Sequence, residues 1–367
     1  MIIVVVVVLL ILALGLAESF FHDRCLRSIP VRILVNGTRG KTSTARLIVS
    51  ALNLSGIPAM GRTTGSEACI INSDGSIEPF VRRHGARITE AIGFARLCSS
   101  RNAKAMVVEC MALGEENQKV FSQNLIKPGY VVITNSYIDH VPEIGSTREQ
   151  TIWTLSRSIN PGSEVYAIDR EYEAYCKAAG ANFHLVSVHD YESMELKSRI
   201  PVHDANISLA VELGKALGIG EPVMLEALKL ALPDIGLDNS FTARSGALFI
   251  PDFAINDYEC MREAIIKASG EKKLCVIYNN RSDREFRLLL ARRIFLELGN
   301  GIDCVYAIGD YPEKCARYFR HSNVKSSAIS VQDLASLIES AGEDYVFLAI
   351  GNIKGSGQLL LQSLGGK

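Results

Sequence analysis

Residues 31–43 read VRILVNGTRGKTS, so a short apolar run leads into a glycine-containing turn and then into a helical pattern. Gly37 and Gly40 can let backbone N–H groups turn inward around a phosphate, and the start of the following helix adds partial positive charge. Lys41 can neutralise β- and γ-phosphate oxygens, and the hydroxyl of Thr42 can ligate magnesium. This order of features predicts a site for ATP and Mg²⁺. The expected nucleotide contacts are Gly37, Thr38, Arg39, Gly40, Lys41, Thr42 and Ser43.

The spacing of this turn differs from the common phosphate-binding loop. That loop reads G-x-x-x-x-G-K-[ST], and here two of its residues are absent. An ordinary glycine turn between a strand and a helix is the alternative interpretation. Because strand, turn, Lys-Thr and helix follow in order, we favour the phosphate loop. A dehydrogenase is disfavoured, since the turn does not read G-x-G-x-x-G and carries Lys-Thr.

Composition and charge exclude several classes of protein. The chain has 367 residues, 48% of them apolar and 22% charged, with a net charge of −1. This length leaves room for about two domains of ~100–200 residues, and the composition excludes a mainly disordered chain. No nucleic-acid partner is expected, because a general nucleic-acid binder normally carries a basic surplus. The nine cysteines are dispersed and form no C-x-x-C pair, which favours reduced thiols over disulfides or a zinc site.

The N-terminal segment 1–17 reads MIIVVVVVLLILALGLA and carries no charged side chain. A membrane-spanning helix needs about 17–25 mostly apolar residues, so we predict a single-pass anchor over residues 1–21. A cleaved signal peptide is one alternative, although no Lys or Arg precedes the run, and a buried core strand is another. Arg24, Arg27 and Arg32 follow the run. The positive-inside rule therefore predicts a cell-membrane protein with a cytoplasmic catalytic part.

Beyond this segment, short Val- and Ile-rich runs alternate with helical patterns, which predicts an α/β fold with parallel sheets. The expected strands are 31–36, 105–109, 130–135, 164–168, 183–188, 247–251, 274–278, 304–308 and 345–350. The expected helices include 42–54, 206–217 and 284–298. An aperiodic, turn-rich stretch at 233–245 indicates a boundary between two domains, which we place at 30–235 and 245–367.

Further motifs follow in an order that resembles the Mur ligase superfamily, whose enzymes join a carboxylate to an amine using ATP. Besides the glycine turn, they are Glu109 in VVECMA, Asn135, Asp139 and His140 in ITNSYIDH, Asn206 in NISLAV, Asp252 and Asn256 in PDFAIND, and Arg281, Asp283 and Arg284 in NNRSDR. The resemblance implies a central ATP-binding domain with a parallel sheet and a smaller, Rossmann-like C-terminal α/β domain. Thr63-Thr64-Gly65, the ECMA segment and Gly351–Gly355 resemble the ATP-dependent ligase subunits of poly-γ-glutamate synthases within this superfamily.

Several of these residues suit the charge on ATP. Glu109 ends an apolar strand, where ligands bind in parallel sheets, and its carboxylate suits Mg²⁺, although a salt-bridged strand-end carboxylate is the alternative. His140 joins Thr42 and Glu109 as a metal ligand on the resemblance, with an ordinary loop histidine as the alternative. Departures at Pro142, Ile255 and Lys354 leave the metal coordination open. The catalytic residues expected are Lys41, Glu109, His140 and Arg281.

Asn206 could contact adenine, as the resemblance implies, or cap its helix. Arg281 and Arg284 flank Asp283, and arginine forms bidentate bonds with phosphate or carboxylate. A closing second domain would bring such a group to the γ-phosphate, whereas a surface ion-pair cluster is the alternative. The further nucleotide contacts implied are Asn135, Asn206, Arg281 and Asp283.

Arg82 and Arg83 form a basic pair in a glycine-containing loop, which fits docking of a chain with many carboxylates, and equally fits an exposed charged turn. The expected substrate contacts are Thr64, Arg82, Arg83, Asp252, Asn256 and Arg284.

The resemblance implies a membrane-anchored ligase that elongates poly-γ-glutamate through an acyl phosphate and releases ADP and phosphate. The implied partners are glutamate, the poly-γ-glutamate chain, the membrane, and small integral-membrane and export subunits of a synthase complex, with a homo-oligomer left open. One alternative is a folylpolyglutamate-type γ-glutamyl ligase. Another is a P-loop ATPase that powers a membrane complex without forming a bond.

Overall fold

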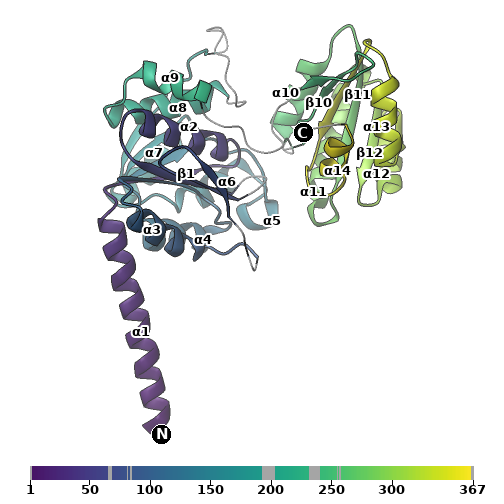
Figure 1. Ribbon diagram of the computed structural model, residues 1–367. Helices are drawn as coiled ribbons and strands as arrows, with labels where there is room; N and C mark the ends of the chain where they lie inside the picture. The colour runs from purple at the N-terminus through teal and green to yellow at the C-terminus, as the bar shows by residue number, and fades with distance from the viewer. Residues whose placement is uncertain are drawn as a thin grey trace. The chain divides into compact units, whose positions relative to one another are not determined.

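The computed structural model describes residues 2–64, 68–80, 82, 85–191, 203–230, 240–253, 255 and 258–364. The chain divides into two compact units, Met1–Leu232 and Pro233–Lys367. Each unit is a sheet covered by helices, as Figure 1 shows. Most of the domain boundary that we predict at 233–245 lies outside the described residues.

The first unit is built on an eight-stranded sheet with the order β4-β3-β2-β5-β1-β6-β7-β8. The pairs from β2 to β8 are parallel, whereas β3 and β4 pair antiparallel at one edge. The chain order reverses around β1, so the turn that follows β1 opens where α/β sheets bind their ligands. The strands are β1 (Val31–Asn36), β2 (Ala59–Thr63), β3 (Cys69–Ile71), β4 (Ile77–Pro79), β5 (Ala105–Glu109), β6 (Tyr130–Ile133), β7 (Glu164–Ala167) and β8 (Asn182–Leu185).

Helices cover both faces of this sheet. Ile33 and Val35 of β1 pack in one core with α2, α8 and α9, while Leu34 points into a second core with α3 and η1. Ile33, Leu34 and Val35 are therefore consecutive apolar residues, because both faces of the strand are covered by helices. The helices are α1 (Ile2–Arg27), α2 (Lys41–Leu54), α3 (Glu90–Ser100), α4 (Glu115–Lys119), η1 (Val120–Ile126, a π-helical segment), α5 (Val141–Ile144), α6 (Arg148–Ser156), α7 (Tyr172–Ala179), α8 (Asp204–Ala216) and α9 (Glu221–Leu230).

Helix α1 is long and apolar enough to cross a membrane, and its apolar N-terminal part extends away from the sheet (Figure 1). Its last turns dock on the first unit. Nε2 of His22 donates to the carbonyl of Leu125 at 2.8 Å, and Asp23 pairs with Lys127 at 2.6 Å. The helix therefore runs past the predicted anchor limit at residue 21. A core strand over residues 1–17 is wrong, because this stretch from residue 2 is helical and exposed.

The second unit has a six-stranded sheet with the order β13-β12-β11-β14-β10-β9, parallel except for the β9–β10 pair. Helices α10, α11 and α12 contribute to one core, and α13 and α14 contribute to the other. The strands are β9 (Phe241–Thr242), β10 (Leu248–Ile250), β11 (Lys273–Asn280), β12 (Cys304–Gly309), β13 (Ser326–Ala328) and β14 (Tyr345–Ile350). The helices are α10 (Tyr258–Ala268), η3 (Ser282–Arg284), α11 (Glu285–Leu298), η4 (Gly299–Gly301), α12 (Pro312–Arg320), α13 (Val331–Ser340) and α14 (Ser356–Ser363).

The predicted α/β class is confirmed, and the bounds of β1, β5 and β14 agree with the prediction. Five strands were not predicted: β2, β3, β4, β9 and β13. They are short or interrupted by polar residues, so they lack a continuous apolar run. The predicted helix 206–217 begins two residues earlier, at Asp204, and His203 is its N-cap residue. The helix-cap interpretation of Asn206 is therefore wrong.

Candidate active site

The turn after β1 has a shape that only glycine allows at two positions. Gly37 has φ +121° and Gly40 has φ +74°. A Cβ on Gly37 would lie 2.1 Å from Oγ1 of Thr134, and one on Gly40 would lie 2.1 Å from Nδ2 of Asn206. Both glycines are thus required by backbone conformation and by close packing. The turn is held in one shape at the carboxyl edge of the sheet.

Side chains that follow β6 brace this turn. Oδ1 of Asn135 accepts from the hydroxyl of Thr38 at 2.8 Å and from the backbone N–H of Arg39 at 3.0 Å. Nδ2 of Asn135 donates to the carbonyl of Arg39 at 3.1 Å, and the hydroxyl of Thr134 donates to the same carbonyl at 2.5 Å. Asn135 therefore supports the phosphate loop, which is a structural role in addition to the nucleotide contact that we predict for it.

Lys41 begins helix α2, and its ammonium group folds over the turn. Nζ donates to the carbonyls of Gly37 at 2.8 Å and Thr38 at 3.2 Å. A phosphate would offer Nζ charged oxygens, which bind an ammonium more strongly than neutral carbonyls do. The geometry therefore places a cation at the turn, where its bonds to described residues are to neutral carbonyls.

Thr42 and Glu109 meet beside this turn. The hydroxyl of Thr42 donates to Oε2 of Glu109 at 2.9 Å, and the backbone N–H of Thr64 donates to the same oxygen at 2.7 Å. Glu109 is buried and ends β5, next to β1. A carboxylate and a hydroxyl are ligands that suit Mg²⁺, with phosphate oxygens and water completing its shell. These two of the three predicted metal ligands are thus brought together.

His140 lies in a left-handed conformation, φ +49°, beside Asp139. Its backbone N–H donates to Oδ1 of Asp139 at 2.9 Å, and Oδ2 of Asp139 pairs with Arg39 at 3.0 Å. Asp139 thereby ties His140 to the phosphate loop. Within the described ranges, no group of three or more His, Cys, Asp or Glu side chains could hold a metal ion. Metal ligation by His140 stays a prediction.

Asn206 packs against the loop from helix α8. Its side chain is buried, and its Oδ1 has no hydrogen-bond partner in the part of the chain that the structure describes. The amide of Asn206 thus faces Gly40, and its Oδ1 can accept a further hydrogen bond. The predicted adenine contact is not tested by this geometry.

Cys110 follows Glu109 in the ECMA segment, and burial raises the pKa of its thiol to about 12. The thiol lies 3.3 Å from Oε1 of Gln118. A thiol with this pKa stays protonated near neutral pH, so we expect Cys110 to pack the site in its neutral form.

The basic pair predicted at positions 82 and 83 is only partly described. Arg82 pairs with Glu90 at 3.1 Å, and Arg83 lies outside the described residues. A second arginine, Arg62, pairs with the same Glu90 and was missed by sequence reasoning. A charged residue within a strand was the available signal, but β2 itself was not predicted.

In the second unit, Arg281 forms a bidentate pair with Asp283, at 3.0 and 2.7 Å, and Arg284 lies 3.8 Å from the same carboxylate. This is the ion-pair cluster that we gave as the alternative, and it does not test a contact to phosphate. Asp252 follows β10, while Asn256 lies outside the described residues.

Two asparagines that we did not predict hold the turn after β14. Nδ2 of Asn352 donates to the carbonyl of Asn279 at 3.0 Å, and Nδ2 of Asn279 donates to the carbonyls of Asn352 and Lys354. Gly351 has φ +103°, and a Cβ there would lie 2.8 Å from the carbonyl oxygen of Asn279. The Gly-Asn-Ile turn is therefore fixed against the end of β11.

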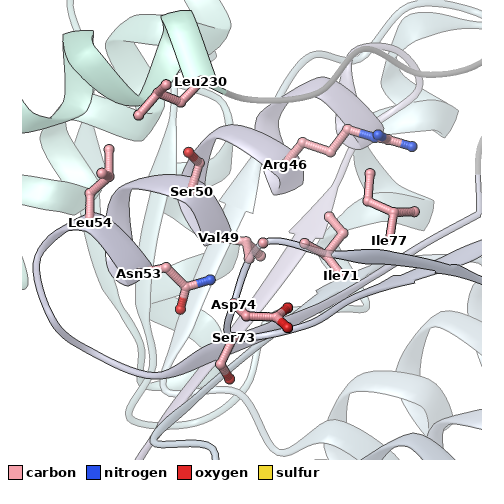
Figure 2. A pocket seen from close by; sticks show the side chains of 11 residues that line it. Arg46, Val49, Ser50, Asn53, Leu54, Ile71, Ser73, Asp74, Ile77 and Leu230 are labelled. Carbon is pink, nitrogen blue, oxygen red and sulfur yellow. The ribbon is translucent and has the colours of Figure 1, made fainter.

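A cavity of about 340 Å³ lies along helix α2 (Figure 2). Residues from the middle and end of α2, the β3–β4 turn and Leu230 line it. They are Arg46, Val49, Ser50, Asn53, Leu54, Ile71, Ser73, Asp74, Gly75, Ile77 and Leu230. No residue of the turn 37–42 is among them, so this cavity is separate from the candidate active site.

Comparison with known proteins agrees with this fold and site. The Mur ligase middle domain matches residues 35–211, and the poly-gamma-glutamate synthase CapB C-terminal domain matches residues 239–367. The PGA synthase CapB of Bacillus subtilis is 26% identical, over 96% of this chain and 95% of the relative. The capsule biosynthesis protein CapB of Bacillus anthracis is also 26% identical, over 95% and 80%.

Solved structures show the same fold at low identity. MurF from Acinetobacter baumannii has a TM-score of 0.70 at 16% identity, over 97% of this chain and 80% of that one. A folylpolyglutamate synthase/dihydrofolate synthase from Yersinia pestis, complexed with AMPPNP and a Mn ion, has a TM-score of 0.70 at 13% identity, over 94% and 92%.

Fold, phosphate loop and matches together define the class of protein: the chain belongs to the Mur ligase superfamily of ATP-dependent, amide-bond-forming ligases. Within this superfamily, its C-terminal domain and its two curated relatives are of the CapB type, and the predicted resemblance is confirmed.

Proposed function

We propose that this chain elongates poly-γ-glutamate, using ATP and Mg²⁺, while anchored in the cell membrane. The observation that carries the proposal is the glycine turn with Lys41 over it and the Thr42–Glu109 contact, 2.9 Å long, beside it. The substrate is supported by the CapB-type relatives, which align with nearly the whole chain.

An amine cannot displace oxide from a carboxylate, because oxide is a very poor leaving group. Transfer of the γ-phosphoryl group of ATP to a carboxylate of the growing chain forms an acyl phosphate and ADP. The amino group of glutamate then attacks the acyl carbon, phosphate leaves, and an amide bond has formed. The enzyme has to position these reactants and neutralise their charge.

Residues of the first unit supply these functions. The N–H groups of Gly37, Thr38 and Arg39 already donate within the protein, so Nζ of Lys41 and the backbone N–H groups at the start of α2 bind the β- and γ-phosphates, while Asn135 keeps the turn in shape. Thr42 and Glu109 would hold Mg²⁺, which neutralises charge on the phosphates as the phosphoryl group moves. In the second unit, we propose that Arg281 releases the carboxylate of Asp283 and binds a phosphate oxygen instead.

Helix α1 is proposed to be the single-pass anchor, with both units in the cytoplasm. Its apolar stretch is exposed, and Arg24 and Arg27 lie at its end, as the positive-inside rule expects on the cytoplasmic side. The polymer must then leave through other proteins, so small integral-membrane and export subunits are the proposed partners.

Full-length protein in nanodiscs, supplied with ATP, Mg²⁺, labelled glutamate and an oligo-γ-glutamate acceptor, tests the proposal. We expect ADP release that depends on glutamate and acceptor, and products that grow by one glutamate at a time in mass spectrometry. Growth of a folate acceptor alone would favour the folylpolyglutamate-type alternative. ATP hydrolysis without an amide product would favour the ATPase alternative.

A further inference from the structure

Arg62 is a fully buried cation at the carboxyl end of β2. Its Nη2 pairs with Glu90 and lies 3.6 Å from Sδ of Met111. Its Nε and Nη1 are buried and have no hydrogen-bond partner in the part of the chain that the structure describes. Guanidinium donors left without acceptors cost free energy, because burial removes the water that would satisfy them.

The donors around Arg62 outnumber their acceptors among the described residues. Nε of Arg82 binds both oxygens of Glu90, at 3.1 and 3.2 Å, so two guanidinium groups share one carboxylate. Glu90 also accepts from the backbone N–H of Arg87, and it lies at the start of α3, where partial positive charge collects. Nη2 of Arg82 is a third buried nitrogen without a partner in the described ranges. Among the described residues, Glu109 is the second carboxylate that interacts with Arg62, and the cluster keeps three buried guanidinium nitrogens without an acceptor.

Phe80 covers both guanidinium groups of the cluster with an apolar ring. Its ring centroid lies 4.6 Å from Cζ of Arg62 and 5.9 Å from Cζ of Arg82. An apolar ring beside two guanidinium groups lowers the local dielectric and strengthens a charged hydrogen bond. A guanidinium group also presents parallel donors at the spacing of carboxylate oxygens.

The cluster lies on the same edge of the sheet as the phosphate loop. Arg62 pairs in register with Val108, the residue before Glu109. Two residues after Arg62, the N–H of Thr64 binds the Glu109 oxygen that also accepts from Thr42. An anion held by Arg62 would therefore lie beside the proposed site of phosphoryl transfer, within the first unit.

We propose that Arg62 and Arg82 bind a carboxylate of the acceptor chain, the α-carboxylate of its terminal residue. This inference rests on the proposed function. The terminal residue of a γ-linked chain carries two carboxylates, and only one of them can be phosphorylated if the linkage is to stay γ. The partly exposed Arg82 makes the first contact, and Arg62 is reached when the Phe80 ring and the Arg82 side chain move aside. Holding the α-carboxylate leaves the γ-carboxylate to face ATP.

Steady-state kinetics of Arg62→Lys test this site, because lysine keeps the charge but not the planar fork. We expect the KM for oligo-γ-glutamate to rise on the order of tenfold or more, with the KM for ATP unchanged. Arg262→Lys is the matched control, since Arg262 pairs with Glu297 at an exposed position and should change neither constant. An unchanged acceptor KM in Arg62→Lys, or a rise in the KM for glutamate alone, would overturn the proposal.

An acceptor whose terminal α-carboxylate is replaced by a carboxamide supplies a second, independent readout. Wild-type protein should bind this analogue more weakly than the natural acceptor, and Arg62→Lys should discriminate much less between the two. A purely structural role, in which Arg62 only anchors Glu90 and α3, predicts equal discrimination in both proteins, which contradicts the proposal. If Arg62→Lys does not fold, Arg82→Gln decides the question by the same two measurements. A wild-type protein without glutamate-dependent ADP release would instead contradict the proposed function.

Discussion

Replacing Gly40 by alanine tests whether the turn after β1 must keep its observed shape to bind nucleotide. Gly40 has φ +74°, and a Cβ there would lie 2.1 Å from Nδ2 of Asn206. A non-glycine residue in left-handed backbone costs about 1–2 kcal/mol, and displacing the Asn206 amide adds about 1 kcal/mol. If the variant relieves this strain by leaving the binding shape, nucleotide affinity falls by about 2–3 kcal/mol, or roughly 30- to 150-fold.

Equilibrium binding of a fluorescent, non-hydrolysable ATP analogue to the full-length protein measures this loss. Gly56→Ala is the matched control, because Gly56 follows the other end of α2 with φ +83° and a Cβ there meets nothing within 4 Å. It should keep its affinity within about twofold while losing stability. Combining Gly40→Ala with Asn206→Ala should give less than the sum of the two losses, since the close contact is then gone. Wild-type affinity in Gly40→Ala would refute the reasoning.

Three further predictions concern side chains around the same site. Lys41→Ala should abolish polymer synthesis and leave the thermal midpoint unchanged, because Nζ contacts only loop carbonyls among the described residues; product detected by mass spectrometry would contradict this. Glu109→Gln should raise the Mg²⁺ concentration for half-maximal activity by about tenfold or more, and an unchanged Mg²⁺ titration would exclude Glu109 as a ligand. Burial raises the pKa of both Cys98 and Cys110 to about 12, so at about pH 8 their reactive thiolate fraction is small. Iodoacetamide should label them only after denaturation, as peptide mapping would show, and rapid native labelling would show that they are accessible.

Local signals in the sequence were sufficient to predict the strand, the glycine turn and the helix that follows it. The apolar run of β1, the two glycines and Lys41-Thr42 follow one another within 12 residues, so their order is visible in the sequence. Glu109 could be proposed for a similar reason, since it ends a continuous apolar strand. Their meeting through the Thr42–Glu109 contact follows from parallel strands that end at the same edge.

Contacts between distant residues could not be predicted from local patterns. Arg62 lies in a strand that glycine and arginine interrupt, and its partner Glu90 lies 28 residues further along the chain. Asn279 and Asn352 are 73 residues apart and meet only because β11 and β14 are neighbours. The capping alternative for Asn206 was wrong for a simpler reason, and the predicted nucleotide contact stays a prediction. The helix begins at Asp204, two residues earlier than predicted. An error of one residue in a predicted helix boundary is enough to assign the cap to the wrong residue.

The central claim is that the γ-phosphoryl group of ATP is transferred to a carboxylate of the acceptor chain. The fate of the oxygen atoms of that carboxylate tests this claim most directly. Oligo-γ-glutamate labelled with oxygen-18 in its carboxylates is incubated with full-length protein, ATP, Mg²⁺ and glutamate, and the released phosphate is analysed by mass spectrometry. An acyl phosphate intermediate requires that each inorganic phosphate carries one labelled oxygen from the acceptor and that the nucleotide product is ADP. Unlabelled phosphate, or AMP with pyrophosphate as the products, would contradict γ-phosphoryl transfer at this loop.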